Sequence, residues 1–362
     1  MLPVTWQAFA GHLAFCAVLA VLSAIVVRLV IAARLMDVPN SRSAHERPTP
    51  KGGGLGVVVA TLAGLIVLYA RAETARIADP YFIAVIGGGA AIAAVSLADD
   101  AFDFPFFWKL AVQVVAAALP IGFGLVLDRL SLPFVGEVPL GPFAIPVTLF
   151  WIVFVTNAMN FVDGLNGLCA GTAAVASGFL AVIALSEGGS FVYAAGLFLC
   201  AGSLGFLPFN FPAARIFLGD VGSQFIGYML ATLAVAAARF EATAVSFFIV
   251  PLLLAMPLFD VAFTLIRRAI AGEGLIHAHR GHLYQVLDRS GFPRVGVALI
   301  HWGFTATMGI AAFRFLALTP PGKLVLYLAV AGALGCYALW VAQRARRAGI
   351  VHWSRTPPRA LH

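Results

Sequence analysis

The sequence predicts an all-α polytopic membrane protein with about ten or eleven transmembrane helices. Of its 362 residues, 61% are apolar and only 11% are charged, whereas soluble domains are usually about 45–50% apolar and about 25% charged. The apolar residues form long runs rather than short alternating segments, which favours helices over a transmembrane β-barrel. A single soluble domain and a disordered chain are both excluded.

Eleven apolar runs are candidate spans, since a helix needs roughly 20 residues to cross a bilayer. The fifth is the weakest, because Pro142 and Pro146 interrupt its start. The first lacks the basic segment and cleavage site of a signal peptide, so we expect a retained span. The runs cover residues 8–30, 54–70, 81–98, 108–127, 143–159, 168–186, 191–209, 222–238, 244–266, 294–315 and 321–342.

The basic residues predict the orientation of these spans. With the N-terminus outside, 16 of the 23 lysines and arginines fall in inner segments and 6 in outer ones, as the positive-inside rule requires. We therefore expect a cytoplasmic C-terminus, one membrane domain over residues 1–343 and a basic cytoplasmic tail over 344–362. The net charge of +7 is then explained by topology and anionic lipid, without nucleic-acid binding.

The first inner loop combines basic residues with three consecutive glycines. It reads His45-Glu-Arg47-Pro-Thr-Pro-Lys51-Gly-Gly-Gly. Glycines let a backbone approach a ligand closely, and their amides can point at anionic oxygens. His45, Arg47 and Lys51 are therefore candidates for binding an anionic substrate. A positive-inside loop with a turn explains the same residues equally well.

Carboxylates follow two of the spans and precede a third. Asp99 and Asp100 are adjacent at a membrane boundary, where they repel one another unless a cation or phosphoryl group lies near. Asn157, Asn160 and Asp163 lie on one stripe of a helix. Asp220, between glycines, suits a hard cation such as Mg²⁺. The structural alternatives are a solvated helix end, interhelical hydrogen bonds and, for Asp220, a helix N-cap.

Two further candidates lie nearer the C-terminus. Asp260 lies inside an apolar run, and an intramembrane carboxylate is a functional candidate by default; an ion pair with Arg267 or Arg268 is the structural alternative. The last inner loop contains three histidines around Arg280. Zinc is disfavoured, because no cysteine or suitably spaced carboxylate accompanies them. Arg280 and His282 instead fit anion binding and proton handling, unless the histidines are incidental.

All of these clusters fall on the predicted cytoplasmic side. Carboxylates that hold Mg²⁺, together with basic residues that offset charge, are what phosphoryl transfer requires. A site of this kind within a membrane suggests one water-soluble and one lipid-embedded substrate. A secondary transporter is an alternative interpretation. The polar residues of a transporter should lie near the midplane in broken helices, whereas the polar residues of this chain lie at one face of the membrane.

At these motifs the chain resembles the polyprenyl-phosphate N-acetylhexosamine-1-phosphate transferases, whose superfamily includes the phospho-N-acetylmuramoyl-pentapeptide translocase. The resemblance covers about residues 37–295. It implies a cytoplasmic active site in the bacterial inner membrane that transfers sugar 1-phosphate from a UDP-N-acetylhexosamine to undecaprenyl phosphate and releases UMP. The matching strings are His45 with Pro48-Thr-Pro50 and its glycines, Asp99-Asp100, Asn157 to Gly167, and Phe217-Leu-Gly-Asp220-Val-Gly-Ser223.

The resemblance also implies roles for individual residues. Asp220 and Asp99 match metal ligands for Mg²⁺, with Mn²⁺ as an alternative, and Phe217 matches a ring that stacks on uracil. Whether the protein forms a homodimer is left open by the resemblance. The residues expected to be catalytic are Asp99, Asp100, Asp163, Asp220 and His282. Those expected to bind substrate are His45, Arg47, Lys51, Asn157, Asn160, Asn210, Phe217, Asp260 and Arg280.

The chain departs from the family pattern in its last inner loop. Many relatives carry His-x-His-His there, whereas this chain has His282-Leu-Tyr284-Gln285. Asn166 also stands where the translocase has an aspartate. Both differences argue against a muramoyl-pentapeptide substrate, which remains the alternative. They favour the first membrane step of O-antigen or another surface or cell-wall glycan.

Overall fold

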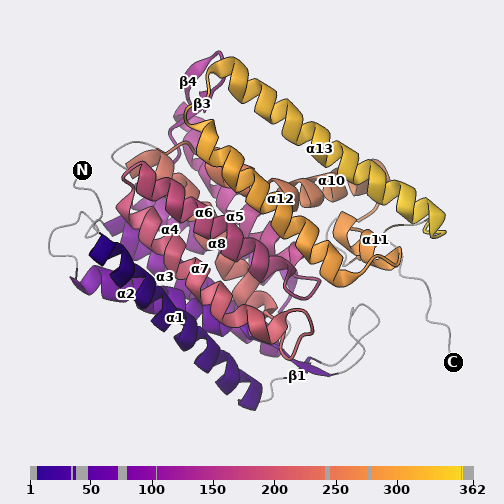
Figure 1. Ribbon diagram of the computed structural model, residues 1–362, viewed down its shortest axis with the longest axis horizontal. Helices are drawn as coiled ribbons and strands as arrows, with labels where there is room; N and C mark the ends of the chain where they lie inside the picture. Colours follow the sequence, from indigo (N-terminus) through magenta and orange to yellow (C-terminus); the bar gives the residue numbers. More distant parts are fainter. Residues whose placement is uncertain are drawn as a thin grey trace.

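The protein is a bundle of long helices with one small hairpin at each end (Figure 1). The computed structural model describes residues 6–33, 36–37, 48–71, 80–102, 104–240, 245–274, 279–351 and 353. In these residues the α-helices are α1 (Trp6–Ala33), α2 (Gly54–Arg71), α3 (Pro80–Phe102), α4 (Phe106–Gly122), α5 (Ala144–Val162), α6 (Leu168–Ser186), α7 (Ser190–Asn210), α8 (Gly219–Phe240), α9 (Ile249–Leu253), α10 (Ala255–Ile270), α11 (Leu283–Arg289), α12 (Arg294–Phe315) and α13 (Pro320–Arg347).

Nine helices in the described residues are long and apolar enough to cross a membrane. The predicted all-α polytopic membrane protein is therefore confirmed. The fourth predicted run forms the shorter helix α4, and the fifth forms α5 after a short 3-10 turn at Gly141–Phe143. The sixth, seventh and eighth runs correspond to α6, α7 and α8.

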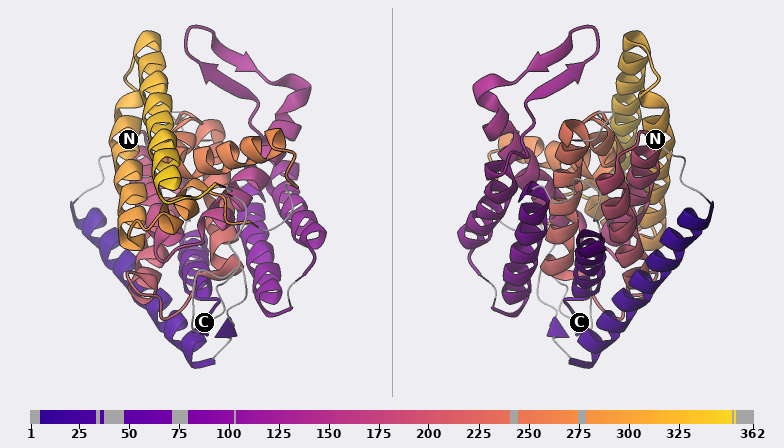
Figure 2. Two further views of the ribbon diagram at one scale, coloured as in Figure 1. Left: turned by 90° about the vertical axis from the view of Figure 1, so that its right-hand side faces the viewer. Right: turned by 90° about the vertical axis from the view of Figure 1, so that its left-hand side faces the viewer.

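The ninth predicted run, residues 244–266, is not one continuous helix. It divides into α9 and α10 at Leu254. Pro257 explains the break, because it has no N–H to donate to the carbonyl of Leu253 and its ring collides with that carbonyl. As a result α10 runs at a steep angle to the long helices (Figure 2).

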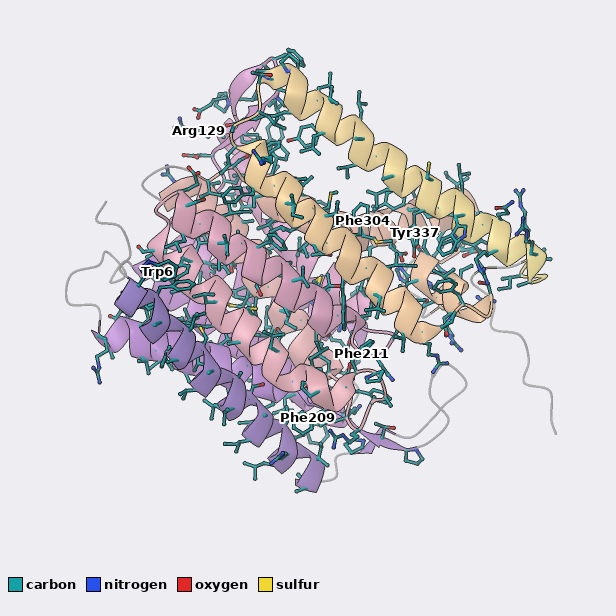
Figure 3. All side chains as sticks on the ribbon, viewed as in Figure 1. Trp6, Arg129, Phe209, Phe211, Phe304 and Tyr337 are labelled. Atoms are coloured by element: carbon teal, nitrogen blue, oxygen red, sulfur yellow. The ribbon has the colours of Figure 1, made fainter. Side chains whose placement is uncertain are left out.

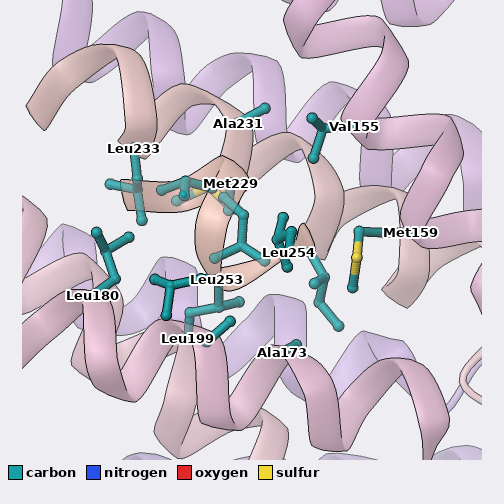
Figure 4. Close-up of a cluster of buried hydrophobic side chains, with 14 of the residues drawn as sticks. Val155, Met159, Ala173, Leu180, Leu199, Met229, Ala231, Leu233, Leu253 and Leu254 are labelled. Atoms are coloured by element: carbon teal, nitrogen blue, oxygen red, sulfur yellow. The ribbon is translucent and has the colours of Figure 1, made fainter. Parts of the chain in front are cut away.

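Helix α8 is the centre of the bundle. In its most apolar stretch 94% of residues are buried, against 17% in α1 and 22% in α13. Figure 4 shows how Met229 and Leu233 of α8 meet side chains of α5, α6, α7 and α9. Because lipid is as apolar as leucine, such helices associate through close packing. The central helix therefore gives Asp220, in its first turn, a fixed position.

Two antiparallel hairpins lie at opposite ends of the bundle (Figures 1 and 2). Strand β1 (Met36–Asp37) pairs with β2 (Thr49–Pro50), and β3 (Arg129–Leu132) pairs with β4 (Gly136–Pro139). Figure 3 labels Arg129 at one end of the bundle, and Phe209 and Phe211 at the other, where α7 ends. The end with β1 and β2 is called the site end below.

The glycines after β2 make a close backbone contact with the start of α8. The amides of Gly53 and Gly54 donate to the carbonyls of Phe217 and Leu218 at 2.9 and 2.8 Å. A Cβ on Gly54 would overlap the Cα of Gly222. These two amides are used within the protein, so the interpretation that they face an anion is wrong. The glycines instead fix the loop against α8.

We expect Gly54→Ala to lower the stability of the folded protein, because neither backbone can move away from the added methyl group. Overpacking of this kind costs about 1–3 kcal/mol, which should lower the unfolding midpoint of the detergent-solubilised protein by several degrees. Gly87→Ala is the matched control, since a Cβ at Gly87 meets nothing within 4 Å. Equal midpoints for the two variants would contradict the contact.

Candidate active site

Four aspartates from three helices meet at the site end, as the sequence predicted. Asp100 of α3 accepts hydrogen bonds from the amides of Asp220 and Val221, both at 3.4 Å. Asp163, directly after α5, accepts the amide of Gly219. Burial, and then the carboxylates of Asp220 and Asp100, raise the pKa of Asp163. The predicted convergence of acidic residues is confirmed.

Lys109 is the residue that makes this acidic cluster tolerable. Its Nζ lies 2.6 Å from Oδ2 of Asp99 and 3.6 Å from Oδ2 of Asp220. Lys51 adds a second cation 3.9 Å from Oδ1 of Asp100. In the sequence, Lys109 contributes only to the excess of positive charge on the inner side. Its position at the start of an apolar run, one turn before Gln113, was the signal that could have identified it as a site residue.

Asn160 and Gln224 hold Asp220 in place. Nδ2 of Asn160 donates to Oδ1 of Asp220 at 3.0 Å and to Oγ of Ser223 at 3.1 Å. Nε2 of Gln224 donates to Oδ2 of Asp220 at 3.2 Å. Because α8 begins at Gly219, Asp220 lies in the first turn and is not an N-cap. Both oxygens of this carboxylate are therefore oriented by side chains.

A chain of amides supports these contacts deeper in the bundle. Nδ2 of Asn157 donates to Oε1 of Gln113 at 2.6 Å, and Nε2 of Gln113 donates to Oε1 of Gln224 at 2.9 Å. Helices α4, α5 and α8 are thus joined through buried polar groups that lipid would not satisfy. Asn157 is part of this support, and its binding of substrate stays a prediction.

Asn210 and Phe217 lie in the connection between α7 and α8. Oδ1 of Asn210 accepts the amide of Gly167 at 2.5 Å, and its Nδ2 donates to the carbonyl of Ile216 at 2.9 Å. The buried Asn210 therefore connects two loops, and its role as a substrate ligand stays a prediction. Phe217 is half-buried beside the site, and stacking of its ring on a base stays a prediction.

Asp260 lies beneath the last inner loop. It is fully buried, and its oxygens accept hydrogen bonds from Thr264, His282, Leu283 and Tyr284. It therefore holds this loop, and its contact with substrate stays a prediction. The structural alternative, an ion pair between Asp260 and an arginine, is wrong, because Arg267 and Arg268 instead pair with Glu273 at 3.7 and 3.2 Å.

The last inner loop reaches the site end through His282. Its ring stacks on Phe161 near the end of α5, with centroids 5.8 Å apart. Arg280 lies at 4.0 Å from Asp288 and belongs to the same loop. Tyr284, which in the sequence is only a departure from the family's His-x-His-His string, donates its hydroxyl to the carbonyl of Phe161 at 2.8 Å. His45 and Arg47 lie outside the described residues.

The donor set suits a hard divalent cation. Carboxylate oxygens are the ligands that Mg²⁺ prefers, and Asp220 is oriented while remaining partly exposed. The oxygens of Asp99 already contact Lys109 and the amide of Phe104, at 2.6 and 2.7 Å. This arrangement favours Asp220 over Asp99 as a ligand. Among the described residues, no group of three or more His, Cys, Asp or Glu forms a complete metal cage.

The fold and this acidic centre define a polytopic membrane protein with a polar site at one end of its bundle. The family model described as "Glycosyl transferase family 4" matches residues 82–238, which include all four aspartates. The chain belongs to this family of membrane transferases.

Related proteins align with most of the chain. A Bacillus subtilis protein named "probable undecaprenyl-phosphate N-acetylglucosaminyl 1-phosphate transferase" is 32% identical over 285 residues, covering 78% of this chain and 77% of the relative. A decaprenyl-phosphate N-acetylglucosaminephosphotransferase of Mycobacterium tuberculosis is 33% identical, with coverage of 78% and 76%. A phospho-N-acetylmuramoyl-pentapeptide-transferase of Leuconostoc citreum is 33% identical, covering 51% of this chain and 60% of the relative.

We expect His279 to make stability depend on pH. Burial, then His282 and Arg268, lower its pKa from 6.5 to about 4. Between these values the unfolded chain binds a proton that the folded chain does not, so stability falls as the pH drops from about 6.5 to about 4. The unfolding midpoint of His279→Gln should therefore fall less between about pH 7 and about pH 5 than that of the parent. Parallel curves would contradict this assignment.

Proposed function

We propose that the protein transfers an N-acetylhexosamine 1-phosphate from a UDP-sugar to undecaprenyl phosphate and releases UMP. This would be the first membrane step in the synthesis of a surface or cell-wall glycan. The observation that carries the proposal is Asp220, oriented by Asn160 and Gln224 beside Lys109. The names of the relatives with the longest coverage support both substrate classes.

We also propose that this site faces the cytoplasm of a bacterial inner membrane. The excess of basic residues predicted on the inner side supports the orientation. Lys51, before α2, and Lys109, in the first turn of α4, lie at this end, where a nucleotide sugar is available, and Arg280 lies beside Asp288 of α11. The polyprenyl phosphate would approach from the inner leaflet.

The proposed reaction is a direct displacement. A phosphate oxygen of the lipid forms a bond to the β-phosphorus of the UDP-sugar, and the bond between that phosphorus and the bridging oxygen breaks. The electron pair leaves with UMP. Lys109 and Lys51 offset the negative charge that accumulates at the diphosphate. The site therefore acts mainly by holding two anions together.

Asp100 is the better candidate to accept a proton from the lipid phosphate. Its hydrogen bonds and its ion pair with Lys51 are all 3.4 Å or longer, whereas Asp99 makes two contacts shorter than 3 Å. Asp99 would then orient Lys109. Phe217 would stack on uracil, and Arg280 and His282 would approach the phosphates or the sugar.

Asp220 would hold Mg²⁺, with Mn²⁺ as an alternative, near the diphosphate. Bound there, Mg²⁺ would supply positive charge that stabilises the departing UMP. Its carboxylate is the only one of the four held by two neutral side-chain amides among the described contacts. These amides are neutral, and the ammonium of Lys109 lies 3.6 Å from the same carboxylate, so part of its negative charge is left for a cation.

Asp220→Ala should abolish UMP release, because the variant removes the proposed metal ligand. The assay uses purified protein, undecaprenyl phosphate and a panel of UDP-N-acetylhexosamines that includes the muramoyl-pentapeptide donor. Chelation should stop release, and added Mg²⁺ should restore it. Glu137→Ala is the control, since Glu137 lies in the hairpin at the opposite end. Near-normal turnover by Asp220→Ala would remove the metal assignment, and solute transport without UMP would favour a transporter.

We expect no phosphorylated protein during turnover. With donor labelled in the β-phosphate, acid-quenched samples should carry label in the remaining donor and in the lipid product but none on the protein, because the displacement is direct. A labelled aspartate that passes its label to added undecaprenyl phosphate would instead establish a two-step route, in which a carboxylate is the nucleophile.

A further inference from the structure

The carboxylate of Asp260 binds three consecutive residues of the last inner loop. Its Oδ1 accepts the amide of Leu283 at 2.8 Å, and its Oδ2 accepts the amide of Tyr284 at 3.0 Å. Oδ1 also lies 3.2 Å from Nδ1 of His282. No part of Asp260 is exposed. A buried carboxylate is costly unless such donors satisfy it, so these contacts determine one loop conformation.

The contact with Nδ1 also determines which nitrogen of His282 carries the proton. A carboxylate only accepts hydrogen bonds, so Nδ1 must be the donor. The lone pair of a neutral ring is then on Nε2. The ring is held on its faces by aromatic groups, with centroids 4.9 Å from His279 and 5.8 Å from Phe161.

Tyr284 connects the same loop to the end of α5. Its hydroxyl donates to the carbonyl of Phe161 at 2.8 Å. A Cβ on Gly164 would overlap this hydroxyl, so a glycine is needed there for the contact. Asp163 is the residue directly before it. The loop that carries His282 and the turn that carries Asp163 are therefore held together.

We propose that Asp260 is a positioning residue for the transfer reaction, acting through His282. It holds the ring with Nε2 as the acceptor and fixes the loop on the end of α5. The inference rests on the proposed function. It matters more in this chain than in relatives with the His-x-His-His string, because Tyr284 and Gln285 occupy the last two positions of that string and are used for structure. Oε1 of Gln285 accepts the amide of His282 at 3.3 Å.

Asp260→Asn tests the proposal with almost no change in volume. The amide can donate to Nδ1, which would favour the tautomer with the proton on Nε2. We expect kcat for UMP release to fall about 10–100-fold, as for other groups that orient an active histidine, with KM for the donor changed less than about threefold. Thr264→Val is the matched control: it removes the 3.2 Å hydrogen bond to the same carboxylate and should keep kcat.

A double variant separates positioning from general destabilisation. If Asp260 acts through His282, Asp260→Asn adds little to the loss already caused by His282→Gln. Independent, multiplying losses would overturn the proposal. So would a folded Asp260→Asn protein with the parental kcat.

Hydrogen exchange followed by mass spectrometry gives a readout that needs no activity. The amides of Leu283 and Tyr284 should exchange slowly in the parent protein without substrate and faster in Asp260→Asn, but not in Thr264→Val. If the amides of Leu283 and Tyr284 in the parent protein exchange as fast as those of an open loop, the proposal is overturned. This holds even if the variant does not fold. If the parent protein releases no UMP, the proposed function is refuted. The exchange rates would still show whether Asp260 holds the loop.

Discussion

The contact of Lys109 with two carboxylates is the interaction on which the site depends. Asp99, Asp100, Asp163 and Asp220 lie where an apolar bundle meets water, and like charges at such a boundary repel strongly. One ammonium group 2.6 and 3.6 Å from two of them offsets part of that repulsion. The remaining negative charge attracts a cation, and the lysines attract an anion. A magnesium diphosphate provides both.

The rest of the fold serves to keep this arrangement rigid. Helix α8 is surrounded by other helices, and its first turn is fixed by the glycine loop on one side and by Asn160 on the other. Amides of Gln113, Asn157 and Gln224 join three helices below the carboxylates. Preorganised groups of this kind lose little free energy to reorganisation during a reaction.

Much of the fold and part of the site could be predicted from the sequence. Apolar runs and positive charge identified the helices, because a bilayer imposes length and composition directly. The acidic motifs identified Asp100, Asp163 and Asp220, because charges are rare in such a chain.

The break at Leu254 was missed because hydropathy does not register the carbonyl that Pro257 obstructs. Lys109, Gln224 and Tyr284 were missed because their importance depends on which helices are neighbours. The hydrogen bonds that Asn210 and Asp260 make to neighbouring loops could not be foreseen, because a buried polar residue looks the same in sequence whether it binds a ligand or another loop.

The central position of α8 has a consequence for how this protein can diversify. A helix enclosed by neighbours leaves little room for substitutions, so the part of the site that handles the diphosphate must be nearly invariant in shape. The segment over residues 279–289, which ends in α11, reaches this end from outside α8 and is held there by Asp260 and by the carbonyl of Phe161. New sugar specificities would therefore arise at the partly exposed positions of this segment, such as Arg280, and a designer who wants another donor should vary those positions and leave His282, Tyr284 and the acidic end untouched.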